Sequence, residues 1–208
     1  MTISKTKIFN MALNELGVSA PIQNAEAQDD NRAIILRNFY EIARDEVLKA
    51  YDWNFAERYR DLTPTQDKCL DPNFTYVYDY PNDCLCGREL YQATEDGKYK
   101  SKADGIGLKY KFKLSANDDG QKVLLANISP AVLRYTRKVE KEVFFDPEYA
   151  IALALYLAGL TGKAITGSED KANAALKKYD YKMKSGMVAN ASEGQEVDED
   201  NSTYLDVR

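Results

Sequence analysis

The sequence predicts an α+β protein, with helices at both ends of the chain and a β-rich region between them. Three observations predict this class. Apolar residues recur at helical spacing over residues 1–56, and they alternate with polar residues over 57–140. The helical pattern then returns after Asp146-Pro147. We expect the N- and C-terminal helices to form one bundle, from which the β-rich region projects, with an extended acidic tail after it.

The first two helices are predicted from apolar spacing and from the residues at their ends. Ser4–Leu16 forms a short helix that stops at Gly17. A longer helix begins after Asp29 and Asp30, whose carboxylates cap it, and runs to about Tyr51. This second helix needs a large partner surface, because it carries one continuous apolar stripe: Leu36, Phe39, Ala43, Val47 and Ala50.

Large aromatic side chains are concentrated where the long helix ends. Tyr51, Trp53 and Phe55 lie within five residues, and Trp53 is the only tryptophan. This pattern is typical of a structural joint and not of a catalytic site. We expect Trp53 and Phe55 to fasten the helical bundle to the β-rich region.

The β-rich region is predicted to hold several short strands separated by turns. Phe74–Tyr80 and Cys84–Tyr91 are rich in strand-forming residues. Residues 99–102 and 108–114 flank a hairpin turn around Gly105. A last strand is expected over 131–139, in preference to a helix beginning at Ser129-Pro130.

The C-terminal third returns to helix and then becomes acidic. Residues 149–165 are almost all apolar, which predicts a helix buried on several sides. Ser168 caps a further helix that runs to about Met187. The predicted domains are therefore a helical bundle (1–56 and 141–188), a β-rich inserted domain (57–140) and an acidic tail (189–208). A partner could order the tail through five of its residues: Glu196, Asp198, Glu199, Tyr204 and Leu205.

Composition narrows the classes of function. The chain has 208 residues, a net charge of −5 and no histidine, which excludes Ser-His-Asp and Cys-His catalysis. The three cysteines (Cys69, Cys84 and Cys86) suit neither a disulfide framework nor a zinc site, so no metal is expected. We expect no membrane partner, because no apolar run reaches about 18 residues and no signal peptide precedes the first helix.

Lysines alternate with aromatic residues around the predicted Gly105 hairpin. On paired strands they would share one face, where their repulsion favours an anionic partner such as an acidic chain or nucleic acid. A solvated edge hairpin explains the same pattern, because lysines deter aggregation at sheet edges. The candidate contact residues are Lys98, Lys100, Lys102, Lys109, Lys111 and Lys113.

Two further functions remain open from the residues alone. Paired carboxylates, such as Asp29 with Asp30 or Glu41 with Asp45, could serve a cell-wall glycosidase. The lysine face could instead define a nucleic-acid-binding module, although the acidic net charge argues against one. Helix capping and solvated helix faces also explain these carboxylates.

Several short segments, taken in order, form a recognisable series that covers most of the chain outside the lysine-rich segment and the acidic tail. They are Ala12–Gly17, Ala43-Arg44, Trp53–Ala56 with Arg60 and Leu62, Tyr78–Pro81 with Asp83 and Leu85, Leu133–Tyr135, and Phe145–Pro147 with Tyr149, Ala152, Ala154, Leu157 and Ala158. In this order and spacing they resemble the head-to-tail adaptor family of short-tailed bacteriophages, also called tail tubular protein A or tail accessory factor.

The resemblance implies a structural virion protein and not an enzyme. Proteins of this family form a ring, commonly of twelve copies, that joins the portal to the tail nozzle and leaves a channel for DNA. Their termini reach the portal, and they need no cofactor. We therefore expect a homo-oligomeric ring in the virion neck, assembled in the host cytoplasm. DNA would pass through it without sequence-specific binding.

Overall fold

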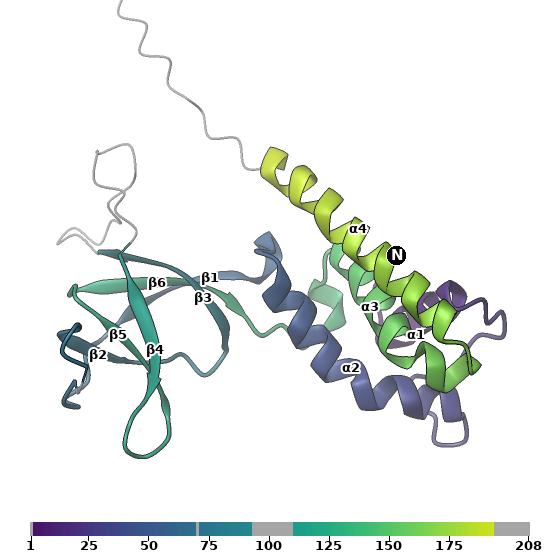
Figure 1. The fold of residues 1–208 in the computed structure, drawn as a ribbon, viewed down its shortest axis with the longest axis horizontal. Helices are drawn as coiled ribbons and strands as arrows, with labels where there is room; N and C mark the ends of the chain where they lie inside the picture. Colours follow the sequence, from purple (N-terminus) through teal and green to yellow (C-terminus); the bar gives the residue numbers. More distant parts are fainter. Residues whose placement is uncertain (1, 70, 93–109, 194–208) are drawn as a thin grey trace, which may run out of the picture.

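A computed structural model describes residues 2–69, 71–92 and 110–193, and it confirms the α+β class. Within these ranges the chain forms four α-helices and two three-stranded antiparallel sheets. The helices gather at one end of the molecule and the sheets at the other, as Figure 1 shows. The chain crosses between these parts after α2 and again before α3.

The helices begin and end near the predicted residues. Ser4 caps the first helix, Asp30 the second and Asp146 the third, each by accepting a backbone N–H bond. Gly167, with a φ of 72°, ends the third helix in the left-handed conformation that glycine adopts easily. The bounds are α1 (Lys5–Glu15), α2 (Asn31–Ala50), α3 (Pro147–Thr166) and α4 (Glu169–Glu193).

Helix α3 is the centre of the helical part, because α1, α2 and α4 all pack against it. Ten of its twenty residues are buried, as its apolar composition predicts. By length and composition α3 could cross a membrane, the only such helix among the described residues, although 61% of that window is buried. We expected no apolar segment long enough to cross a membrane, and by length and composition α3 is such a segment.

Helix α4 is longer than the sequence analysis predicted. It continues past Met187 to Glu193, so residues 189–193 are helical and do not belong to an extended tail. Ala189 and Ala191 favour helix, and the first glycine beyond them is Gly194. Residues 194–208 lie outside the described ranges.

The six strands form two sheets that enclose a second hydrophobic core. One sheet has the order β1-β6-β3 and the other β2-β5-β4, with every neighbouring pair antiparallel. The inner faces contribute Leu133 and Tyr135 from β6, Tyr78 from β2 and Leu124 from β5. The bounds are β1 (Glu57–Leu62), β2 (Tyr76–Asp79), β3 (Cys84–Gln92), β4 (Phe112–Ala116), β5 (Lys122–Ala126) and β6 (Ala131–Arg137).

The strand predicted over 131–139 is confirmed as β6, at the centre of its sheet. Alternation along β6 turns Leu133 and Tyr135 toward the second core, and Arg134 and Thr136 toward the opposite face. Polar contacts connect that opposite face to the C-terminal end of α2. The sheet β1-β6-β3 is therefore the surface on which the two parts of the molecule meet.

Candidate functional site at the joint between helices and sheets

An aromatic cluster closes the helical core where α2 ends. Trp53 is 5% exposed, and its indole N–H donates to the carbonyl oxygen of Val47 at 2.9 Å. Its ring meets that of Tyr149 on α3 edge to face, with centroids 5.3 Å apart. Phe55 contacts the same tyrosine at 5.1 Å, and Tyr51 contacts Trp53 at 5.1 Å. Edge-to-face contacts add to the stabilisation that burial provides.

The three aromatic residues of the predicted joint thus pack mainly against the helices. Trp53 belongs to the helical core, while Tyr51 and Phe55 are half-buried against it. From the sheets, Leu85 of β3 also packs on this core. Arg88 and Arg134 make polar contacts between the two parts.

Arg88 on β3 reaches the C-terminal end of α2. Its Nη2 donates to the carbonyl oxygens of Tyr51 at 2.7 Å and Lys49 at 3.0 Å, with a longer contact of 3.4 Å to Leu48. Its Nε donates to the hydroxyl oxygen of Thr136 on β6 at 2.8 Å. The last carbonyls of a helix lack partners within the helix and carry partial negative charge, so a guanidinium satisfies them well.

Arg134 on β6 binds three carboxylates that come from three segments. Its Nη2 lies 2.5 Å from Asp52 Oδ2, and its Nε lies 2.6 Å from Glu57 Oε2. Its Nη1 lies 3.8 Å from Glu89 Oε2 on β3. Burial lowers the pKa of Arg134, but the bonds to Glu57 and Asp52 more than offset this and leave it above its ordinary value.

We define the joint as residues 51–57 together with Arg88, Glu89 and Arg134. Asp52 connects its two arginines, because its Oδ1 also lies 3.7 Å from the Nε of Arg88. Two guanidinium groups and three carboxylates thus form one network between α2 and the sheet. Planar guanidinium forks fix the direction of their partners, so this network restricts the angle between the two parts.

Burial also fixes the protonation of tyrosines beside the joint. Tyr149 donates to the carbonyl oxygen of Arg44 at 2.9 Å, and burial raises its pKa well above the ordinary value. Tyr135 donates to Asp83 Oδ1 at 2.9 Å, and burial with this bond raises its pKa to about 12. Both phenols therefore stay neutral near pH 7 and serve as structural donors.

Sequence analysis missed Arg88, Arg134 and their carboxylate partners. Alternation along residues 131–139 identifies Arg134 as facing away from the apolar side of its strand. It does not reveal the partners, because Glu57 and Glu89 reach Arg134 only through the pairing of β1 and β3 with β6. One signal was present in the sequence: Arg134 interrupts the run of apolar residues from Ala131 to Tyr135 in the middle of its strand.

Most of the predicted lysine face lies outside the described residues. This applies to Lys98, Lys100, Lys102 and Lys109, whereas Lys111 and Lys113 are exposed at the start of β4. Lys113 Nζ lies 2.8 Å from Asp71 Oδ2, so one lysine of the series is paired within its own chain. The tail residues proposed for partner contact also lie outside the described ranges: Glu196, Asp198, Glu199, Tyr204 and Leu205.

The pairing of Lys113 with Asp71 predicts a measurable change in the pKa of Asp71 when Lys113 is replaced. The bond from Lys113 and bonds from Asn73 lower the pKa of Asp71 to about 2. Because this pKa is lowered in the folded state, the pair stabilises the fold above about pH 4. That stabilisation is lost as the pH falls toward 2. In Lys113→Gln, carboxyl NMR should show the pKa of Asp71 rising toward 3.8.

Lys122→Gln is the matched control for this titration, because Lys122 is also exposed on the same sheet but makes no ion pair with Asp71. It should leave the pKa of Asp71 near 2. An unchanged Asp71 titration in Lys113→Gln would contradict the pairing.

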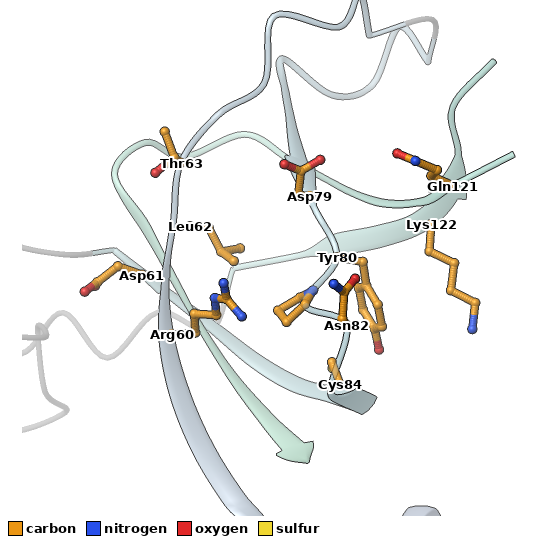
Figure 2. A pocket seen from close by; sticks show the side chains of 11 residues that line it. Arg60, Asp61, Leu62, Thr63, Asp79, Tyr80, Asn82, Cys84, Gln121 and Lys122 are labelled. Atoms are coloured by element: carbon orange, nitrogen blue, oxygen red, sulfur yellow. The ribbon is translucent and has the colours of Figure 1, made fainter. Parts of the chain in front are cut away.

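A polar hollow of about 770 Å³ lies at the open end of the two sheets. Figure 2 shows charged groups spread around its rim, with Arg60 on one side and Lys122 on the other. Asp61 and Asp79 balance these two cations. These charged groups do not point toward one position in the hollow, so they do not indicate a particular ligand. The contacts of the joint, in contrast, indicate a structural role.

The carboxylate pairs considered for glycosidase chemistry make structural contacts. Asp30 accepts the backbone N–H of Arg32 at 2.9 Å as the cap of α2, and Asp45 pairs with Arg44 at 2.8 Å. Among the described residues, no group of three or more His, Cys, Asp or Glu could hold a metal ion. The three cysteines are free thiols.

Comparison with known proteins adds no family assignment. No protein-family model matches the chain, and no curated protein matches it significantly. The fold and the joint define an α+β protein in which a network of arginines and carboxylates connects a helical part to a β part.

Proposed function

We propose that the protein is a structural adaptor of a bacteriophage virion, which forms a ring that joins the portal to the tail nozzle. In this proposal the N- and C-terminal helices form one bundle, and the β region is an inserted domain. The acidic residues 194–208, which lie outside the described ranges, would contact a partner. The proposal comes from the resemblance of the sequence to the adaptor family. The structural observation that supports it is the joint.

The joint supports this proposal because an adaptor must hold two binding parts at a fixed angle. Its aromatic residues include Trp53 and Phe55, which lie in the segment where the resemblance is most distinctive. The network of Arg88 and Arg134 then connects that segment to β3 and β6. A fixed angle would let identical copies direct their β regions along one axis.

The exposed apolar side chains also support an assembly of copies. Of the eight large hydrophobic residues exposed in the described ranges, six lie in the helical part and two in the sheets. Contacts between copies would then form mainly through the helices, and contacts with the nozzle through the sheets. The helical residues are Phe39, Ile42, Val143, Phe144, Ile151 and Tyr181.

Mass measurement of the full chain tests the proposal. With the portal protein of the same virus, we expect a ring, which for twelve copies of a 23.5 kDa chain has a mass of about 280 kDa. Native mass spectrometry and sedimentation velocity measure this mass with and without the portal. A chain that stays monomeric in both conditions would contradict the proposed function.

A further inference from the structure

Two small apolar surfaces lie on different sides of α2. The first, which we call the ridge, consists of Phe39 and Ile42, which are 40% and 60% exposed. The second, which we call the knob, consists of Val143 and Phe144 of the short 3-10 helix η3 (Glu142–Phe144), and these are 59% and 56% exposed. Each surface exposes two large hydrophobic side chains to solvent.

Contacts of neighbouring residues place the ridge and the knob apart. Tyr40 donates to Glu142 Oε1 at 3.0 Å, so η3 lies against the face of α2 that carries Tyr40. The ridge continues to Glu46 at helical spacing, and Glu46 accepts a bond from Tyr156 of α3 on another side of α2. One chain therefore cannot cover its own ridge with its own knob.

The charges beside the two surfaces are opposite in sign. Glu46 follows Ile42 by four residues, a rise of about 6 Å along a helix. Lys141 is the residue directly before η3 and precedes Val143 by two residues, a rise of about 4 Å along a 3-10 helix. A knob placed on a ridge would thus bring Lys141 near Glu46, and both side chains are exposed.

We propose that the knob of one copy docks on the ridge of the next copy and that this contact is lateral. The inference rests on the proposed function and names the surfaces through which the ring forms. Contact between two different surfaces is heterologous, so it propagates from copy to copy and closes into a ring when the rotation permits. Large apolar side chains flanked by opposite charges are typical of such interfaces.

Two complementary variants test the proposal. The ridge variant carries Phe39→Ser with Ile42→Ser, and the knob variant carries Val143→Ser with Phe144→Ser. Each full-length variant alone should lose ring formation with the portal protein, because every contact needs one ridge and one knob. Mixed without the portal, they should form a 1:1 dimer and nothing larger, since only one intact ridge and one intact knob remain.

Sedimentation velocity and native mass spectrometry measure these states, and circular dichroism verifies that each variant is folded. Leu114→Ser is the matched control, because Leu114 is also exposed, at 47%, but lies on β4. It should form rings as the unchanged chain does. As a second measurement, carbodiimide treatment of rings mixed from ¹⁴N and ¹⁵N chains should join Glu46 of one isotope to Lys141 of the other.

The outcomes separate this inference from the proposed function. Rings formed by either variant alone would overturn the ridge–knob contact and leave the adaptor function standing. Absence of the mixed dimer, with both variants folded, would also overturn it. A failure of the unchanged chain and of Leu114→Ser to assemble with the portal would overturn the adaptor function, and this inference with it.

Discussion

Trp53→Ala should lower the free energy of unfolding by about 3–5 kcal/mol, the usual cost of removing a large buried aromatic side chain. The substitution removes the ring contact with Tyr149 and the bond to the carbonyl oxygen of Val47. It leaves a cavity where α2, α3 and the joint meet. Urea denaturation followed by circular dichroism measures the change, because the variant has no tryptophan fluorescence.

Trp53→Phe and Tyr59→Ala are the controls for this prediction. Trp53→Phe keeps an aromatic ring and loses the indole N–H, so a smaller cost is expected, about 1–2 kcal/mol. Tyr59 is 42% exposed on β1, and its loss should cost less than Trp53→Ala. If Trp53→Ala costs no more than Tyr59→Ala, the aromatic cluster does not stabilise the helical core. Because Trp53→Ala is expected to destabilise the helical core, ring assembly with the portal should also fail in this variant.

Arg134→Met should destabilise the protein by about 2–3 kcal/mol at pH 7, because three carboxylates then lack their shared cation. The value is below that of a fully buried pair, since Arg134 keeps 17% of its side chain exposed. Urea denaturation of both proteins at pH 7 measures this loss.

Arg137→Met is the matched control, on the same strand and with the same change of side chain. Arg137 is half-buried and pairs across the sheet with Cys84. It takes no part in the network of the joint, and we expect a change within about 0.5 kcal/mol. Equal losses in the two variants would contradict the role of the Asp52–Glu57–Glu89 cluster.

Local signals in the sequence predicted the helices and the β6 strand because those signals act over a few residues. Ser4, Asp30 and Asp146 cap helices in the structure, and Gly167 ends one. The apolar run over 149–165 is the centre of the helical core because α1, α2 and α4 all pack against α3. The end of α4 was misplaced because Ala189 and Ala191 continue the helix without any apolar stripe to mark it.

The joint could be predicted only in part. Clustered aromatic residues revealed its location, since Tyr51, Trp53 and Phe55 are close in the sequence. The arginines could not be found in that way. Arg88 lies 37 residues from Tyr51, and Arg134 lies 77 residues from Glu57. Their contacts depend on strand order and register, which are set by the whole sheet.

The central position of α3 has a consequence for the order of events during synthesis. The ribosome releases α1 and α2 early, but the helix that covers their apolar stripes begins only at Pro147. All six strands lie between residues 57 and 137, so the sheets can pair before α3 has emerged. The nascent chain therefore exposes the apolar stripes of α1 and α2 throughout this interval, until translation reaches the C-terminal third.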